Sequence, residues 1–239
     1  MIRLASVLNH PIIAACFWST LTIASYLIVK ALYRRWPRWW LAPLALTPLL
    51  LAFAAIFLHT SYHDYIRGTN WLVAMLGPAT VAFAVPIYEQ RKMVRRYWRV
   101  LGLGMLAGSA TSVFSSWALA TVLGLNGTMR LSLLPRSIST PFAMTISGEI
   151  GGAPDLTAVF VVVTGIVGTI VGEILLARLP NYSPLARGAL LGVGAHGAGT
   201  AKAHEFGPEE GSVAGLAMVL VGLFNVLLAP LVVACFRIG

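Results

Sequence analysis

The stretch LLPRSISTPFAMTISGEIGG, residues 133–152, is a polar interruption in a very apolar chain. Of the 239 residues, 58% are hydrophobic and only 10% are charged. A soluble domain carries about 25% charged residues, so much of this chain must face lipid rather than water. The net charge of +9 would suit nucleic acid. However, the basic residues cluster between apolar runs, as in loops of membrane proteins, and we expect no nucleic-acid partner.

Six stretches free of Asp, Glu, Lys and Arg, or nearly so, approach or exceed the roughly 20 residues that cross a bilayer as a helix. They are Leu4–Val29, Trp39–His63, Gly68–Tyr88, Val100–Met129, Leu156–Ala177 and Gly211–Phe236. Two further apolar stretches, Ser137–Gly148 and Gly188–Ala201, are too short to cross as regular helices. Segments of that length are typically re-entrant, and non-helical backbone at membrane depth is tolerated only inside protein or beside a water-filled cavity.

The sequence therefore predicts an all-α polytopic membrane protein with about six full transmembrane helices and two broken or re-entrant segments. We expect one integral membrane domain over residues 1–239. Scaffold helices would occupy 1–65 and a transport core 66–239, with broken segments at 131–150 and 186–202. Gly-x-x-x-Gly motifs recur along the chain, which fits either an internal repeat or ordinary glycine packing faces. The same faces favour a homodimer.

Basic loops predict the orientation in a bacterial inner membrane. Four basic residues lie between Lys30 and Arg38, and five lie between Glu89 and Arg99. Cytoplasmic loops carry such excesses. Alternation of the spans then places the N-terminus outside.

The first broken segment carries a candidate anion site. Pro141 interrupts a helix and pushes Thr140 toward extended backbone, which frees backbone groups for a ligand. Arg136 supplies a planar fork suited to a carboxylate, and Ser137, Ser139 and Thr140 add hydroxyls. The alternative is a plain external loop whose hydroxyls cap helix ends.

The second broken segment contains His196 among four closely spaced glycines. Gly197 and Gly199 allow close approach of a ligand or a helix, and Thr200 adds a hydroxyl. The alternative is a small-residue packing face with one satisfied histidine. His196 is also the first candidate for proton coupling, with Glu149 and Lys202 as further candidates.

Signatures of enzymes are missing from the sequence: there is no His-Glu-x-x-His, Gly-x-Ser-x-Gly or P-loop motif. His59 and His63 are four residues apart, but only Asp64 is nearby to complete a metal site. We expect no enzymatic activity, no cofactor and no metal.

Three ordered blocks carry a resemblance to a known family. They are MLGPATVAFAVPIYEQ (75–90), LLPRSISTPFAMTISGEIGGAPDLTAVFVVVTGIVG (133–168) and ARGALLGVGAHGAGTAKAHEFGPEEGSVAGLAM (186–218). Together they resemble the LrgB/CidB family, which includes YohK-like inner-membrane proteins. They also resemble the C-terminal half of the plastidial glycolate/glycerate translocator.

The resemblance implies an inner-membrane protein that works beside a small LrgA/CidA-like membrane partner. Family members have been described as holin-like modulators of murein hydrolases and as transporters of small carboxylates. A lysine or arginine is usual in the family at the position of Arg136. We therefore expect a secondary transporter of small monocarboxylates such as pyruvate or glycolate, proton-coupled and working by alternating access. The alternative is a holin- or antiholin-like protein that modulates murein hydrolases and cell lysis.

Overall fold

The computed structural model describes the chain except for residues 1–10, 37, 83, 126, 179–181 and 237–239. Residues 4–10 of the first predicted span therefore lie outside the described part. The chain forms two compact units, residues 1–79 and 80–239, and each is described by itself. The predicted division into a scaffold up to residue 65 and a core after it stays a prediction.

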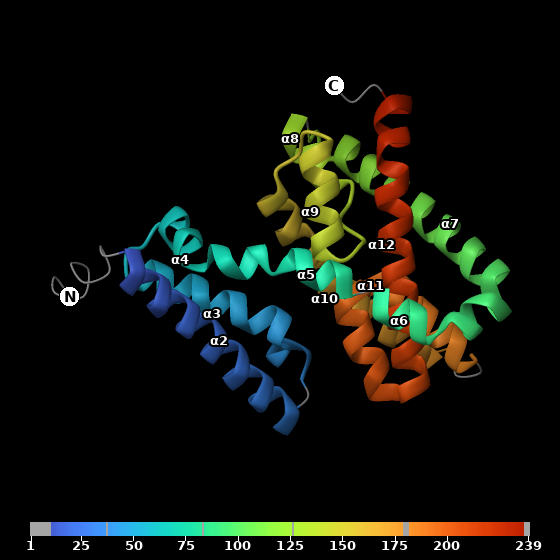
Figure 1. The fold of residues 1–239 in the computed structure, drawn as a ribbon, viewed down its shortest axis with the longest axis horizontal. Coiled ribbons are helices and arrows are strands. Elements are labelled where there is room, and N and C mark those ends of the chain that lie inside the picture. Colours follow the sequence, from blue (N-terminus) through green and yellow to red (C-terminus); the bar gives the residue numbers. More distant parts are fainter. Residues whose placement is uncertain (1–10, 37, 83, 126, 179–181, 237–239) are drawn as a thin grey trace. The chain divides into compact units, whose positions relative to one another are not determined.

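All regular structure in the described residues is helical (Figure 1). The helices are α2 (Pro11–Arg35), η1 (Trp39–Leu41), α3 (Pro43–Phe57), α4 (Tyr62–Ala74), α5 (Leu76–Ala82), α6 (Ala84–Glu89), α7 (Arg91–Val122), α8 (Gly127–Leu133), α9 (Thr140–Glu149), α10 (Pro154–Arg178), α11 (Pro184–Phe206) and α12 (Pro208–Phe236). Within the described ranges, five helical stretches are long and apolar enough to cross a membrane: Ile12–Arg35, Tyr62–Glu89, Arg91–Val122, Pro154–Arg178 and Pro208–Leu231. The chain is an all-α polytopic membrane protein, as predicted.

The second predicted span, Trp39–His63, is shorter than expected. Its helix α3 has 15 residues. Pro43 occupies its first turn, where a missing N–H costs nothing, and the chain turns at His59, which has φ 51°. This apolar helix is the sixth hydrophobic element, and it falls short of the usual spanning length.

In the first unit, α2 packs against α3 and α4. Gly68 of α4 lies close to the backbone of α2, and the Ser19 hydroxyl donates to the Gly68 carbonyl at 3.1 Å. Trp18 is buried edge-on against Tyr65. Helices α2 and α4 thus approach closely at Gly68, and α3 packs against α2.

In the second unit, residues 127–149 double back on themselves; we call this segment the first hairpin. The Ala153 N–H donates to the Ser132 hydroxyl at 2.8 Å, so the end of α8 meets the start of α10. The Thr157 hydroxyl lies 3.0 Å from the Ser132 carbonyl and 2.6 Å from the Ser147 hydroxyl. The end of α8 and the end of α9 are thus both fixed at the start of α10.

Helix α11 forms the second hairpin, because it is interrupted at His196, where φ is 38° and ψ is −120°. Beyond the interruption, Gly199 lies against the backbone of Leu191. Ala203, Leu191 and Ala214 share one buried cluster. In a continuous helix, residues 191 and 203 would be about 18 Å apart, so the second arm must run back along the first. Figure 1 shows this helix packed around the first half of α12.

The main core of the second unit joins both hairpins to α10 and α12. Ile138, Phe142 and Ala143 of the first hairpin pack with Val161 and Val221, and Val193 of the second hairpin contacts the same cluster. Phe142 fills the space above Gly222 of α12. The two interruptions predicted from the sequence are therefore present, and both are covered by protein.

Two glycines in the same arm of the second hairpin make a matched test of this packing. A methyl group added at Gly192 would overlap the backbone of Ala214, whereas one added at Gly194 would meet nothing within 4 Å. We expect Gly192→Ala to lower the free energy of unfolding by about 2 kcal/mol and Tm by about 5 °C.

The control, Gly194→Ala, should leave Tm unchanged or raise it, because alanine favours a helix over glycine by up to about 1 kcal/mol. Thermal unfolding in detergent measures both. Equal Tm values for the two variants would contradict the close contact between α11 and α12.

Candidate functional site

Arg136 lies in the loop at the tip of the first hairpin, and three hydroxyls hold its guanidinium. Nε donates to Ser116 at 2.9 Å and Nη2 to Ser115 at 3.3 Å, both on α7. Nη1 donates to Thr164 of α10 at 3.3 Å. A guanidinium has five N–H groups, so two remain for a ligand. No Asp or Glu of the described residues forms an ion pair with Arg136.

The N-terminus of α9 lies at the same tip. Ser139 is its N-cap residue, yet its hydroxyl makes no capping bond. Ser139 is only 6% exposed, and its Oγ has no hydrogen-bond partner in the described part of the chain. Because the first N–H groups of a helix carry partial positive charge, this end of α9 adds to the positive potential at Arg136.

His196 forms the tip of the second hairpin and is 4% exposed. Its imidazole lies beside the backbone of Val161 and packs over Gly165, where an added Cβ would come within 2.8 Å of Cε1. No described residue satisfies Nε2. A buried nitrogen without a partner costs about 1–3 kcal/mol, so this tip is poised to accept or donate one more hydrogen bond.

The two tips meet the same short stretch of α10. Arg136 contacts Thr164, and His196 contacts Val161 and Gly165. Helix α10 is about 37 Å long, and these positions lie about 10–17 Å from its first residue, near its middle. The structure thus brings Arg136, Ser139 and His196 to one level of the bundle, with Thr140 and Pro141 in the first turn of α9.

The other predicted site residues lie at different distances from the two tips. Glu149 is exposed at the far end of α9 from the tip. The Thr200 hydroxyl donates to the His196 carbonyl at 2.9 Å, which supports the interruption of α11. Gly199 is buried against the first arm of the same hairpin, whereas Gly197 is exposed. Ser137 is half-buried in the tip loop.

Lys202 lies on the returning arm of the second hairpin, away from the tip. Its ammonium pairs with Glu173 of α10 and, at 2.7 Å, with Glu205. This contact joins the returning arm to α10. The coupling roles of His196, Glu149 and Lys202 stay predictions.

Sequence reasoning missed the three residues that hold Arg136. Ser115 and Ser116 lie in the apolar run that forms α7, and Thr164 lies in that of α10. Adjacent serines inside a predicted span were the available signal, since polar groups in lipid need partners. Their partner could not be identified without the fold.

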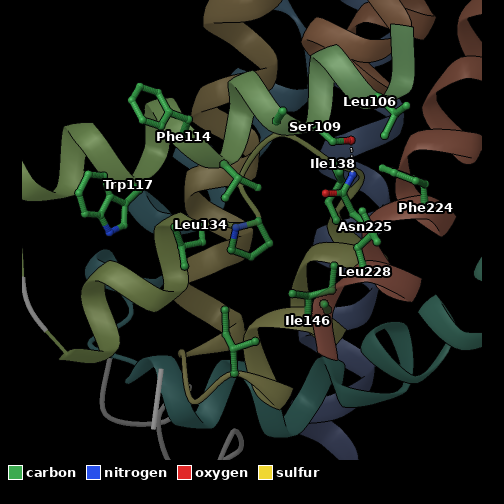
Figure 2. A pocket seen from close by; sticks show the side chains of 15 residues that line it. Leu106, Ser109, Phe114, Trp117, Leu134, Ile138, Ile146, Phe224, Asn225 and Leu228 are labelled. Carbon is green, nitrogen blue, oxygen red and sulfur yellow. Dashed lines mark hydrogen bonds between the residues drawn. The ribbon is translucent and has the colours of Figure 1, made fainter. Parts of the chain in front are cut away.

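An apolar cavity of about 590 Å³ lies beside the first hairpin, between α7, α9 and α12 (Figure 2). Phe114 and Trp117 of α7 line one wall, and Ile146 lies on the opposite side. Its polar contact is the bond from the Asn225 amide to the Ser109 hydroxyl at 2.8 Å. Leu134, Pro135 and Ile138 of the tip loop also line this cavity. The cavity therefore adjoins the first tip, but its largely apolar lining does not suit a carboxylate.

Comparison with known proteins identifies the family. The LrgB-like family model matches residues 22–235, which include both hairpins and the α10 stretch between them. The chain belongs to the LrgB-like family. It is a multi-pass bacterial membrane protein, as its apolar helices and relatives indicate. No solved structure matches this LrgB-like chain.

Several relatives span almost its whole length. YwbG of Bacillus subtilis is 38% identical over 210 residues, covering 88% of this chain and 93% of YwbG. YxaC of the same organism is 37% identical over 218 residues, covering 91% and 95%. The holin-like protein CidB of Staphylococcus aureus is 28% identical over 216 residues, covering 90% and 94%.

The positive φ of His196 can be tested by comparing glycine and alanine at this position. Positive φ is costly for a residue with a Cβ, about 1–3 kcal/mol in sparsely populated regions, and free for glycine. We expect His196→Gly to be more stable than His196→Ala by about 1 kcal/mol. Both variants lack the imidazole, so the difference isolates the backbone.

In an ordinary helix the order would be reversed, because glycine is about 1 kcal/mol less favourable than alanine. Chemical denaturation in detergent compares the two variants. If His196→Ala were the more stable, α11 would be continuous at this position.

Proposed function

We propose that this LrgB-like protein is a secondary transporter of small monocarboxylates, such as pyruvate or glycolate. Arg136 binds the carboxylate with its two remaining N–H groups. The α9 N-terminus and the Ser139 hydroxyl complete the anion site. His196 bonds the second oxygen function of the substrate and is the candidate for proton coupling. Ser137, Gly197 and Thr200 stay predicted members of the site.

The observation that supports this proposal most strongly is that the Arg136 guanidinium is hydrogen-bonded but not neutralised by any acid of the described residues. Charged groups in a membrane bundle are costly and mark ligand or ion paths unless they are paired. Here three neutral hydroxyls orient the guanidinium, and no described acid neutralises it. A bound anion would supply the missing negative charge, and a carboxylate matches the planar fork.

The two hairpins suit alternating access. Interrupted helices that meet near the midplane are typical of secondary transporters. Packing and the Lys202–Glu173 contact connect the returning arm of the second hairpin to α10. Movement of the hairpins relative to α10 would expose the tips to one side at a time. The N-terminus outside, a homodimer and a small LrgA/CidA-like partner belong to the same proposal.

The alternative function is holin- or antiholin-like modulation of murein hydrolases. One relative that favours it is the holin-like protein CidB of S. aureus, whose match covers 90% of this chain. A holin-like pore would need large oligomers and would leak unrelated solutes without saturation. A single vesicle assay can therefore distinguish saturable transport from non-saturable leakage.

Replacing Arg136 tests the proposed site. In proteoliposomes, the unmodified protein should show saturable counterflow of labelled glycolate, pyruvate or lactate. Arg136→Ala should lower it by about 100-fold or more, because a carboxylate loses its charge-assisted partner in a water-poor site. Arg136→Lys should keep measurable uptake, since it keeps the charge.

Arg130→Ala is the matched control, because Arg130 lies in the same hairpin with its guanidinium over the Trp117 ring. Its uptake should equal that of the unmodified protein. Unchanged uptake by Arg136→Ala would remove Arg136 from the site. Non-saturable leakage of unrelated solutes by the unmodified protein would favour the holin-like function.

A further inference from the structure

A basic stripe lies on the first turns of α7, far from both hairpin tips. We define it by its five members, Arg91, Lys92, Arg95, Arg96 and Arg99, all of which are exposed. Arg91, Lys92, Arg95 and Arg96 precede Tyr97, and on an α-helix at 100° per residue they fall within an arc of about 140°. Met93, Val94 and Tyr97 occupy the remaining face and are half-buried. The segment is therefore amphipathic, with all its charge on one side.

Helix stability does not explain this stripe. Cations at a helix N-terminus oppose the macrodipole, and the first turn of α7 contains no acidic residue. No Asp or Glu within the described ranges forms an ion pair with any member of the stripe. The positive charges of the stripe are therefore available to a negatively charged partner outside the chain.

The length of α7 places the stripe in the headgroup layer. The helix has 32 residues, about 48 Å, whereas the hydrocarbon core is about 30 Å thick. About a dozen residues must therefore lie outside the hydrocarbon, and the end at Arg91–Arg99 is the charged one. The helix also departs from helical geometry at Tyr97, where φ is −114° and ψ is 18°. This break separates the first six residues from the apolar part.

Aromatic rings next to the stripe also indicate the membrane interface. Tyr88 and Trp98 are 68% and 62% exposed. Arg91 lies over the Tyr88 ring at 4.4 Å and Arg99 over the Trp98 ring at 5.4 Å. Exposed Trp and Tyr are enriched at the headgroup level, and a ring beside a guanidinium is amphipathic in the way that layer requires.

We propose that the basic stripe is a docking surface for the phosphate headgroups of anionic lipids, which hold this end of α7 at the membrane surface. Juxtamembrane clusters of four to eight Lys and Arg recognise anionic lipids in this way, each charge contributing about fivefold in affinity. The site is independent of the proposed transport function.

Native mass spectrometry of the detergent-solubilised protein tests the stripe. The protein is titrated with dioleoylphosphatidylglycerol or dioleoylphosphatidylcholine at low salt. The unmodified protein should bind the anionic lipid more tightly. The triple variant R91Q/R95Q/R99Q should lose that preference by roughly 100-fold and keep its affinity for the zwitterionic lipid.

The matched control is R67Q/R130Q/R178Q, which removes the same charge from positions outside the stripe and outside the basic cluster at the end of α2. It should keep the preference for the anionic lipid. Equal affinities of the stripe variant and the unmodified protein would overturn the proposal, as would an equal loss in the control. A short single-stranded RNA that displaced the anionic lipid at equal phosphate concentration would assign the stripe to a different polyanion.

If the stripe variant fails to fold, the salt dependence of lipid binding by the unmodified protein still tests the proposal. Raising the salt from 0.05 to about 0.5 M shortens the Debye length from about 14 Å to about 4 Å. The preference for the anionic lipid should then fall about tenfold or more. A preference that survives high salt would show that apolar contact, not the stripe, carries the binding.

Discussion

The structure depends on one constraint: backbone that leaves the helical path inside a membrane must be covered by protein. Two segments of this chain leave that path, at residues 134–139 and at His196. Each is covered by the same stretch of α10, through Thr164 on one side and through Val161 and Gly165 on the other. Without that shared support, the freed backbone groups would each cost several kcal/mol in lipid.

The same constraint explains the composition of the hairpins. Gly165 and Gly168 of α10 leave room for His196 and for the Gly194–Ala195 backbone. Larger residues would push the second tip away from α10. Hydroxyls from α7 and α10 orient Arg136 without neutralising it. Packing thus places a cation, a helix N-terminus and a buried imidazole at one level, and the proposed anion site rests on this arrangement.

The sequence predicted the breaks because prolines, glycines and short apolar lengths are local signals. Pro141 marks the start of α9, and the glycines around His196 mark the break in α11. It could not predict what the breaks contact, because contacts of Arg136 with Ser115 and Thr164 join residues about 20 to 30 positions apart. The ligand role of Thr200 stays a prediction; its hydroxyl donates to the carbonyl of His196. The short length of α3 was missed because apolar composition alone does not show that the helix begins at Pro43 and that the chain turns at His59.

A distance between the two tips tests the central claim most directly. Spin labels at Ser137→Cys and Gly197→Cys, in a C16S/C235S background, would report it by pulsed electron paramagnetic resonance; an added Cβ at Gly197 meets nothing within 4 Å. If both tips lie on the middle of α10, the labels should be within about two helix diameters, roughly 25 Å. A distance of about 35 Å or more, close to the full length of α10, would place the tips at opposite ends and contradict a shared site.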